Sequence, residues 1–155
     1  MKSAVQRIAL AHPVVEESDR GALALADAYW SEIRRRTAGL VRVRTNALGP
    51  ELRLARTLTL FRFGPARIAV EPGLVECRFP IVGGLLAKQE GGWLTFAQRT
   101  APSPCLEIAI EDYLPRLSSD RRGLSVRRLV YREVQERLHG AIGQRYLERM
   151  ARRAR

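Results

Sequence analysis

The sequence has few of the residues that most catalytic and metal sites require. Its 155 residues include only two cysteines and two histidines, and Cys77, Cys105, His12 and His139 stand far apart, with none at the spacing of metal ligands. Because a structural zinc site needs about four ligands, we expect no metal site, and no motif of another cofactor is present. Two isolated thiols are typical of a reducing compartment, so a cytoplasmic location is expected.

Long apolar runs are absent as well. No stretch approaches the roughly 18 consecutive apolar residues that a membrane span needs, and the apolar residues 8–11 end at His12-Pro13, too early for a signal peptide. We therefore expect no transmembrane segment. Residues 83–88 contain two glycines but lack the spacing of a phosphate-binding loop. With 46% hydrophobic and 28% charged residues, the chain is expected to fold as a single domain over residues 1–155.

Acidic residues are scarce, and the excess of positive charge is unevenly distributed. The net charge is +11, and residues 121–155 hold eleven arginines against three glutamates, which leaves +3 for the other 120 residues. A basic surface of this kind attracts phosphate in nucleic acid or at an anionic membrane, so weak polyanion binding is one interpretation. The other is a solvated helix face without a partner. Interleaved aromatic residues and the common nucleic-acid motifs are missing, which counts against a dedicated nucleic-acid module.

Helical periodicity occurs near both ends of the chain. Ser18 can cap a helix, and apolar residues then recur on one side until Gly39, which predicts a helix to about residue 38. Residues 124–155 carry a longer apolar stripe with arginines on the opposite side, which predicts one long amphipathic helix. The stripe consists of Val126, Val130, Val134, Leu138, Ala141 and Ile142.

Between residues 40 and 114 the periodicity changes from about 3.6 to 2, which predicts strands with one covered face. Short connections, including a hairpin turn at Pro72-Gly73, favour an antiparallel meander of about six or seven strands. Residues 51–63 are expected to form one strand, and residues 4–10 form either an edge strand or an ordered arm. The predicted fold class is α+β, with a curved antiparallel sheet gripping the long C-terminal helix.

This order of elements resembles the helix-grip fold of the polyketide cyclase and START-related lipid-transfer (SRPBCC) superfamily. The resemblance runs from the helix that contains Tyr29-Trp30, through the hairpin at Pro72-Gly73, to the closing helix over residues 126–150. In that family the cavity between sheet and helix takes apolar or amphipathic ligands. The resemblance therefore implies a carrier or a cyclase-like enzyme whose partner is a small apolar or amphipathic molecule. No catalytic residue of the family has a counterpart motif in this sequence.

Two polar side chains share strand parity with apolar residues that should face such a cavity. Arg62 stands two residues after Leu60, and Gln98 stands two residues after Phe96. A polar group on a covered face must find a partner, which is either the polar end of a ligand or a structural hydrogen bond. The predicted ligand site consists of Leu58, Leu60, Leu94, Phe96, Val130, Val134 and Leu138, with Arg62 or Gln98 as its polar anchor.

Candidate acid–base groups are few. Glu107 and Glu111 share one face of their strand and would suit acid–base chemistry if they faced a cavity, but Leu106 and Ile108 occupy the expected inner face. We therefore expect both carboxylates to point outward. Three functions remain open: binding of an apolar or amphipathic ligand, polyanion binding through the arginine-rich C-terminal helix, and an interaction subunit without a ligand.

Overall fold

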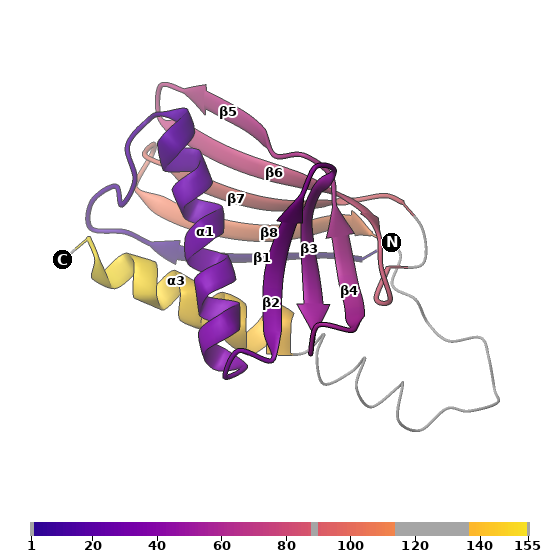
Figure 1. Ribbon diagram of the computed structural model, residues 1–155. Helices are drawn as coiled ribbons and strands as arrows, with labels where there is room; N and C mark the ends of the chain where they lie inside the picture. Colours follow the sequence, from indigo (N-terminus) through magenta and orange to yellow (C-terminus); the bar gives the residue numbers. More distant parts are fainter. Residues whose placement is uncertain (1, 88–89, 114–136, 155) are drawn as a thin grey trace.

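The structure of the protein, a computed structural model, describes residues 2–87, 90–113 and 137–154. It confirms the α+β fold class (Figure 1). The strands are β1 (Lys2–Ala9), β2 (Val41–Asn46), β3 (Gly49–Leu54), β4 (Leu58–Phe63), β5 (Arg67–Glu71), β6 (Leu74–Gly83), β7 (Trp93–Arg99) and β8 (Cys105–Tyr113). The helices are α1 (Asp19–Arg36), the π-helical segment η1 (Arg137–Ile142) and α3 (Gly143–Arg152).

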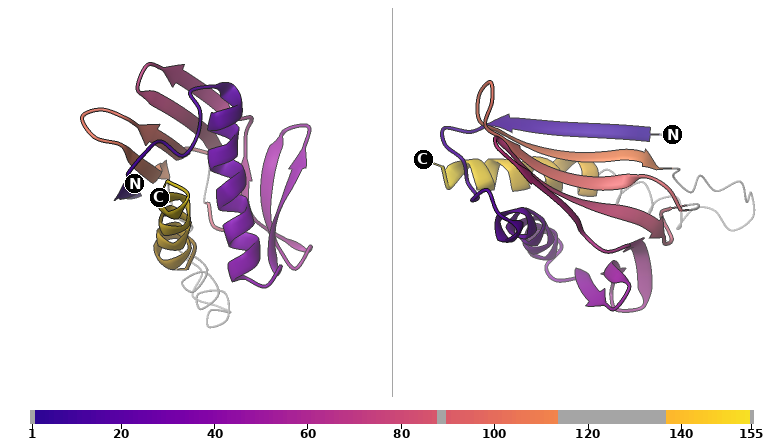
Figure 2. Two further views of the ribbon diagram at one scale, coloured as in Figure 1. Left: turned by 90° about the vertical axis from the view of Figure 1, so that its left-hand side faces the viewer. Right: turned by 90° about the horizontal axis from the view of Figure 1, so that it is seen from above.

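The eight strands form one antiparallel sheet in the order β1-β8-β7-β6-β4-β3-β2, and β5 also pairs with β6. The N-terminal segment is thus an edge strand, the first of the two forms expected. Two strands pair with the same edge of the long strand β6. Residues 74–78 of β6 pair with β5, and residues 81–83 pair with β4. The sheet bends at this division, so that β2, β3 and β4 turn away from the other strands (Figure 2).

Local signals fix α1 at both ends. The Oγ of Ser18 accepts a hydrogen bond from the backbone N–H of Gly21 at 3.0 Å, as an N-cap does. At the other end Gly39, with φ +79°, donates its N–H to the carbonyl of Arg34 at 2.7 Å. The buried side of the helix carries small, aliphatic and aromatic residues. They include Ala22, Leu25, Ala26, Tyr29 and Ile33.

Both helices lie on the concave face of the sheet (Figures 1 and 2). α1 packs on β2, β5, β6 and β7, whereas α3 packs on β1, β8 and α1. The architecture is helix-grip-like, but α1 shares with α3 the face that was expected to hold the terminal helix alone. Ala141, which was predicted in the apolar stripe, is exposed. Ile142, which was predicted in the same stripe, is buried, and the buried side continues through Tyr146, Leu147 and Met150.

Aromatic side chains pack against one another between α1 and the sheet. The ring centroid of Tyr29 lies 5.2 Å from that of Phe96 and 5.5 Å from that of Tyr146. Trp30 lies 5.7 Å from Phe63 and from Phe79. Tilted and edge-to-face pairs of this kind add roughly 0.5–1.5 kcal/mol each to the burial of the rings. None of the described helices is long and apolar enough to cross a membrane.

Candidate functional site

The structure brings together only part of the predicted ligand site. Leu60, Leu94 and Phe96 are fully buried on the concave face. Leu58 lies at the start of β4 and is 46% exposed. Val130 and Val134 lie outside the described residues, as do the side chains of Leu138 and His139. The part of the site that is described is packed against the aromatic side chains of α1.

The placement of Arg62 on the covered face was wrong. In the ladder between β3 and β4, Leu52 pairs with Phe61 and Arg53 pairs with Thr59, so Leu60 is an additional residue on β4. This β-bulge shifts the alternation by one. Phe61 is therefore buried as well as Leu60, and Arg62 is exposed on the outer face. Arg62 is not an anchor for a ligand on the concave face.

Gln98 lies on the covered face, as its parity predicted, and is 1% exposed. Its Oε1 accepts hydrogen bonds from the backbone N–H groups of Val14 at 2.6 Å and Val15 at 3.1 Å. Its Nε2 donates to the carbonyl of Val15 at 2.9 Å. These bonds fasten the connection between β1 and α1 to the sheet, which is the structural role that the sequence left open.

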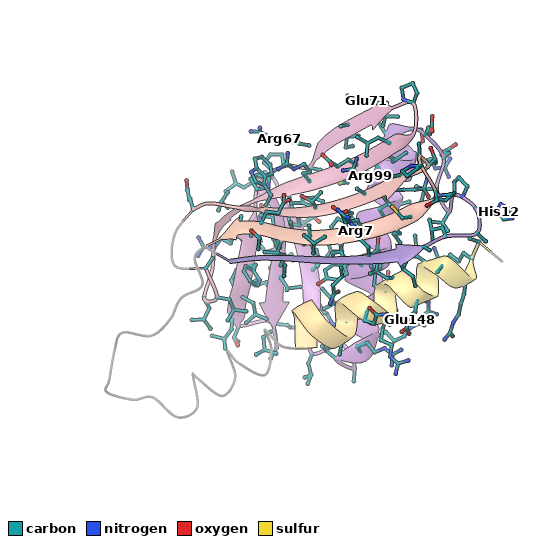
Figure 3. All side chains as sticks on the ribbon, turned by 180° about the vertical axis from the view of Figure 1, so that it is seen from behind. Arg7, His12, Arg67, Glu71, Arg99 and Glu148 are labelled. Carbon is teal, nitrogen blue, oxygen red and sulfur yellow. The ribbon has the colours of Figure 1, made fainter. Side chains whose placement is uncertain are left out.

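The two glutamates of β8 lie on the outer face, as expected from the inward position of Leu106. Glu107 forms an ion pair with Arg7 of β1, and Glu111 lies 3.8 Å from Arg78 of β6. Figure 3 looks onto this face and shows Arg7 and Arg99 along it. Each carboxylate thus faces an arginine, and the two do not form an acid–base pair.

A different group of residues surrounds an open pocket of about 430 Å³ at the β2–β3 hairpin. We call it the arginine pocket. Its lining residues are Gly39, Leu40, Arg42, Val43, Arg44, Arg53, Ala55 and Arg56. The alternation of arginine with valine in β2 was visible in the sequence, but the contribution of β3 depends on strand register.

The arginines of this pocket have few polar partners. Arg42 and Arg53 are directly opposite each other in the β2–β3 ladder. The Nε of Arg42 donates to the carbonyl of Gly39 at 2.9 Å, whereas the Nε of Arg53 is buried without a hydrogen-bond partner. Within the described part of the chain, none of the four arginines forms an ion pair with a carboxylate.

The turn that closes the pocket is strained. Ala55 and Arg56 form the turn between β3 and β4, and both have positive φ angles, +50° and +66°. A residue with a side chain pays roughly 1–2 kcal/mol for this left-handed conformation, and glycine does not. Like charges directly opposite each other in a ladder destabilise the strand pair by up to about 1 kcal/mol. Three unfavourable features therefore coincide here: strain, repulsion between Arg42 and Arg53, and an unsatisfied buried donor.

Reactive groups are shielded elsewhere in the structure. Burial raises the pKa of the Cys77 thiol to about 12, which keeps it protonated and unreactive near neutral pH. Burial also raises the pKa of Tyr29 and of Tyr146. Across residues 2–87, 90–113 and 137–154, no group of three or more His, Cys, Asp or Glu side chains is arranged to hold a metal ion.

Comparisons with known proteins add little. No protein-family model matches the chain, and no curated protein sequence matches it either. One similar solved structure is an uncharacterized protein from Rhizobium leguminosarum, with 13% sequence identity over 96% of this chain and 95% of that chain. Its TM-score is 0.40, which carries no conclusion about fold or function.

Proposed function

We propose that this protein binds phosphate-bearing anions through the arginine pocket. The observation that carries the proposal is the set of four arginines around one pocket without a described carboxylate partner. A guanidinium group offers a planar fork of N–H donors that matches two oxygens of a phosphate. The pocket volume of about 430 Å³ is within the range of small-molecule sites.

A bound anion would offset one of the unfavourable features of the pocket. It would screen the repulsion between Arg42 and Arg53, which face each other in the ladder. Its oxygens would accept hydrogen bonds from the terminal N–H groups of the pocket guanidiniums, whereas the Nε of Arg53 is buried away from the pocket opening. The net charge of +11 attracts anions to the whole molecule, and the pocket gives them a defined site.

The proposal is tested by titrating the protein with inorganic polyphosphate at several salt concentrations. Binding should weaken steeply between about 50 mM and about 200 mM salt, because each neutralised phosphate releases counterions. The variant Arg42→Gln/Arg56→Gln should bind at least tenfold more weakly and lower the slope of log K against log salt by about two. Unchanged affinity and slope in that variant would move the binding site away from the pocket.

Arg99→Gln is the matched control. Arg99 is exposed on the outer face (Figure 3) and forms no described ion pair. It pairs with Leu74 at the end of β6 that lies away from β4. Its replacement removes one positive charge without changing the pocket, so it should lower the affinity less than twofold.

A second candidate function is the binding of a small apolar or amphipathic molecule between the sheet and the terminal helix. It is supported by the helix-grip-like arrangement and by the apolar concave face, with Leu60, Leu94 and Phe96 buried on it. Titration with a fluorescent fatty-acid analogue tests it. Saturable binding with one site per chain, weakened by Phe96→Leu, would support this function, and the absence of saturable binding would count against it.

A further inference from the structure

The arginine pocket lies at one end of the molecule, together with exposed apolar and basic side chains. α1 ends, β2 begins and the β3–β4 turn lies at this end, which is the lower end in Figure 1. We call it the basic end. Leu40 is 60% exposed and Leu58 is 46% exposed there. The carbonyl of Leu40 accepts a hydrogen bond from the N–H of Ala55 at 2.8 Å, so the start of β2 and the turn are held together.

Basic residues surround these leucines. The last turn of α1 carries Arg34 and Arg35, both exposed and without a described carboxylate partner. Arg42 follows Leu40 by two residues, and Arg56 precedes Leu58 by two residues. Exposed leucines scattered singly need no explanation. Here Leu40 lines the arginine pocket, and Leu58 lies two residues from Arg56, which also lines it.

We infer that the basic end docks on an anionic lipid bilayer, with the arginines on lipid phosphates and the leucines in the interfacial region. This inference rests on the proposed function and names the source of its phosphate. Surface-binding proteins combine basic residues, which are attracted to anionic headgroups, with apolar side chains that enter the boundary between headgroups and acyl chains. Leu40 and Leu58 supply the apolar part, and Arg42 and Arg56 lie beside them.

A bilayer fits the basic end better than a nucleic acid does. Proteins that bind single strands stack the bases on exposed aromatic side chains. None of the aromatic side chains whose burial the structure describes is exposed, and those of Tyr113 and Tyr131 lie outside this set. Trp93 lies on the outer face beneath the guanidinium groups of Arg67, at 5.0 Å, and Arg78, at 4.5 Å. Trp30 packs in the core.

The same hairpin provides a matched control. Leu48 is the most exposed large apolar residue of the described chain, at 79%, but it lies in the β2–β3 turn, at the opposite end of the hairpin from Leu40. Leu48→Ser removes an exposed leucine and leaves the basic end unchanged. Leu40→Ser/Leu58→Ser removes the two leucines of the basic end without altering its charge.

The experiment is co-sedimentation with vesicles of phosphatidylcholine alone and of phosphatidylcholine with roughly one-third phosphatidylglycerol. We expect binding only to the anionic vesicles. Leu40→Ser/Leu58→Ser should lower this binding about tenfold, because two side chains no longer leave water, and should leave polyphosphate affinity unchanged. Leu48→Ser should change neither. Circular dichroism verifies that each variant is folded.

Three results would overturn the inference. The first is equal vesicle binding by the wild type and the double leucine variant, and the second is no vesicle binding by a wild type that still binds polyphosphate. The third is binding to a DNA duplex that exceeds vesicle binding at the same salt, which would favour nucleic acid as the partner. If the wild type also fails to bind polyphosphate, the proposed function itself fails, so the two failures are distinguishable.

Discussion

The carboxylate of Glu32 joins α1 to α3 by accepting a hydrogen bond from Arg149. Glu32 Oε2 lies 3.3 Å from Arg149 Nη1, and Oε1 lies 2.9 Å from Arg36 Nε. The Glu32 side chain is 2% exposed, whereas both arginines reach solvent. A carboxylate buried to this degree needs charged partners, because the desolvation of an unpaired charge costs several kcal/mol.

We predict that Arg149→Leu lowers the free energy of unfolding by roughly 1–3 kcal/mol, because a buried carboxylate loses one of its two partners. Urea denaturation measures the change. Arg145→Leu is the control, since Arg145 is 55% exposed and lies 3.7 Å from Glu148 in a surface pair that contributes about 0–0.5 kcal/mol. Equal losses in the two variants would show that Glu32 does not depend on Arg149.

Stability should fall in alkaline solution. Burial raises the pKa of Tyr29 and Tyr146, and that of Cys77 from 9.0 to about 12. Each group therefore releases its proton at a lower pH in the unfolded chain than in the folded one. The stability from their neutral forms is complete below about pH 9 and is lost as pH rises toward about pH 12. Melting temperatures across this range measure the loss, and a constant value would contradict the prediction.

The variant Tyr146→Phe measures the contribution of Tyr146 to this pH dependence. The Tyr146 hydroxyl donates to the carbonyl of Leu25 at 3.0 Å in the core. The variant should lose about 1 kcal/mol at neutral pH, where that hydrogen bond is present. Its stability should then decline less steeply with alkaline pH than that of the wild type. Parallel declines would mean that Tyr146 does not contribute to the pH dependence.

The two thiols should differ in reactivity. Cys77 is fully buried and its pKa is raised to about 12, whereas Cys105 is partly exposed. A thiol-specific disulfide reagent should therefore modify one cysteine of the native protein quickly and the other only after denaturation. Cys105→Ser should remove the fast reaction. Fast modification of Cys77 in folded Cys105→Ser protein would contradict the observed burial.

Substitutions in the strained turn at Ala55-Arg56 distinguish an effect on stability from an effect on binding. Ala55→Gly and Arg56→Gly should each raise the free energy of unfolding by about 1 kcal/mol, because glycine adopts positive φ without strain. Only Arg56→Gly removes a charge from the arginine pocket, so only this variant should weaken polyphosphate binding. Ala55→Gly is its control. Equal affinities of the two variants would exclude Arg56 from the site.

Much of the fold could be predicted from local signals. Ser18 and Gly39 mark the limits of α1, and the turn at Pro72-Gly73, where Gly73 has φ +83°, joins β5 to β6. The turn at Ala55-Arg56 was missed, so residues 51–63 were expected as one strand. Neither residue is a typical former of a left-handed turn. The strain at these residues is the reason that the sequence does not reveal the turn.

The site was less predictable because it depends on register. Side chains alternate regularly between the two faces along β7, so the burial of Gln98 was predicted correctly. The face of Arg62 was predicted wrongly because a bulge at Leu60 interrupts the alternation in β4. The bulge arises from the pairing with β3, which the sequence of β4 alone does not reveal. The pairing of Arg42 with Arg53 depends on the same register, so the sequence showed the arginines but not the pocket.

Nuclear magnetic resonance of the arginine side chains tests the anion site most directly. The Nε–Hε signals of Arg42 and Arg53 can be assigned by comparison with Arg42→Gln and Arg53→Gln, and followed while inorganic polyphosphate is added. We predict that both signals shift with saturation, because an anion bound in the pocket changes the electrostatic surroundings of both guanidinium groups. The Arg99 signal should remain in place. Shifts confined to arginines of residues 121–155, with Arg42 and Arg53 unchanged, would contradict the proposed site.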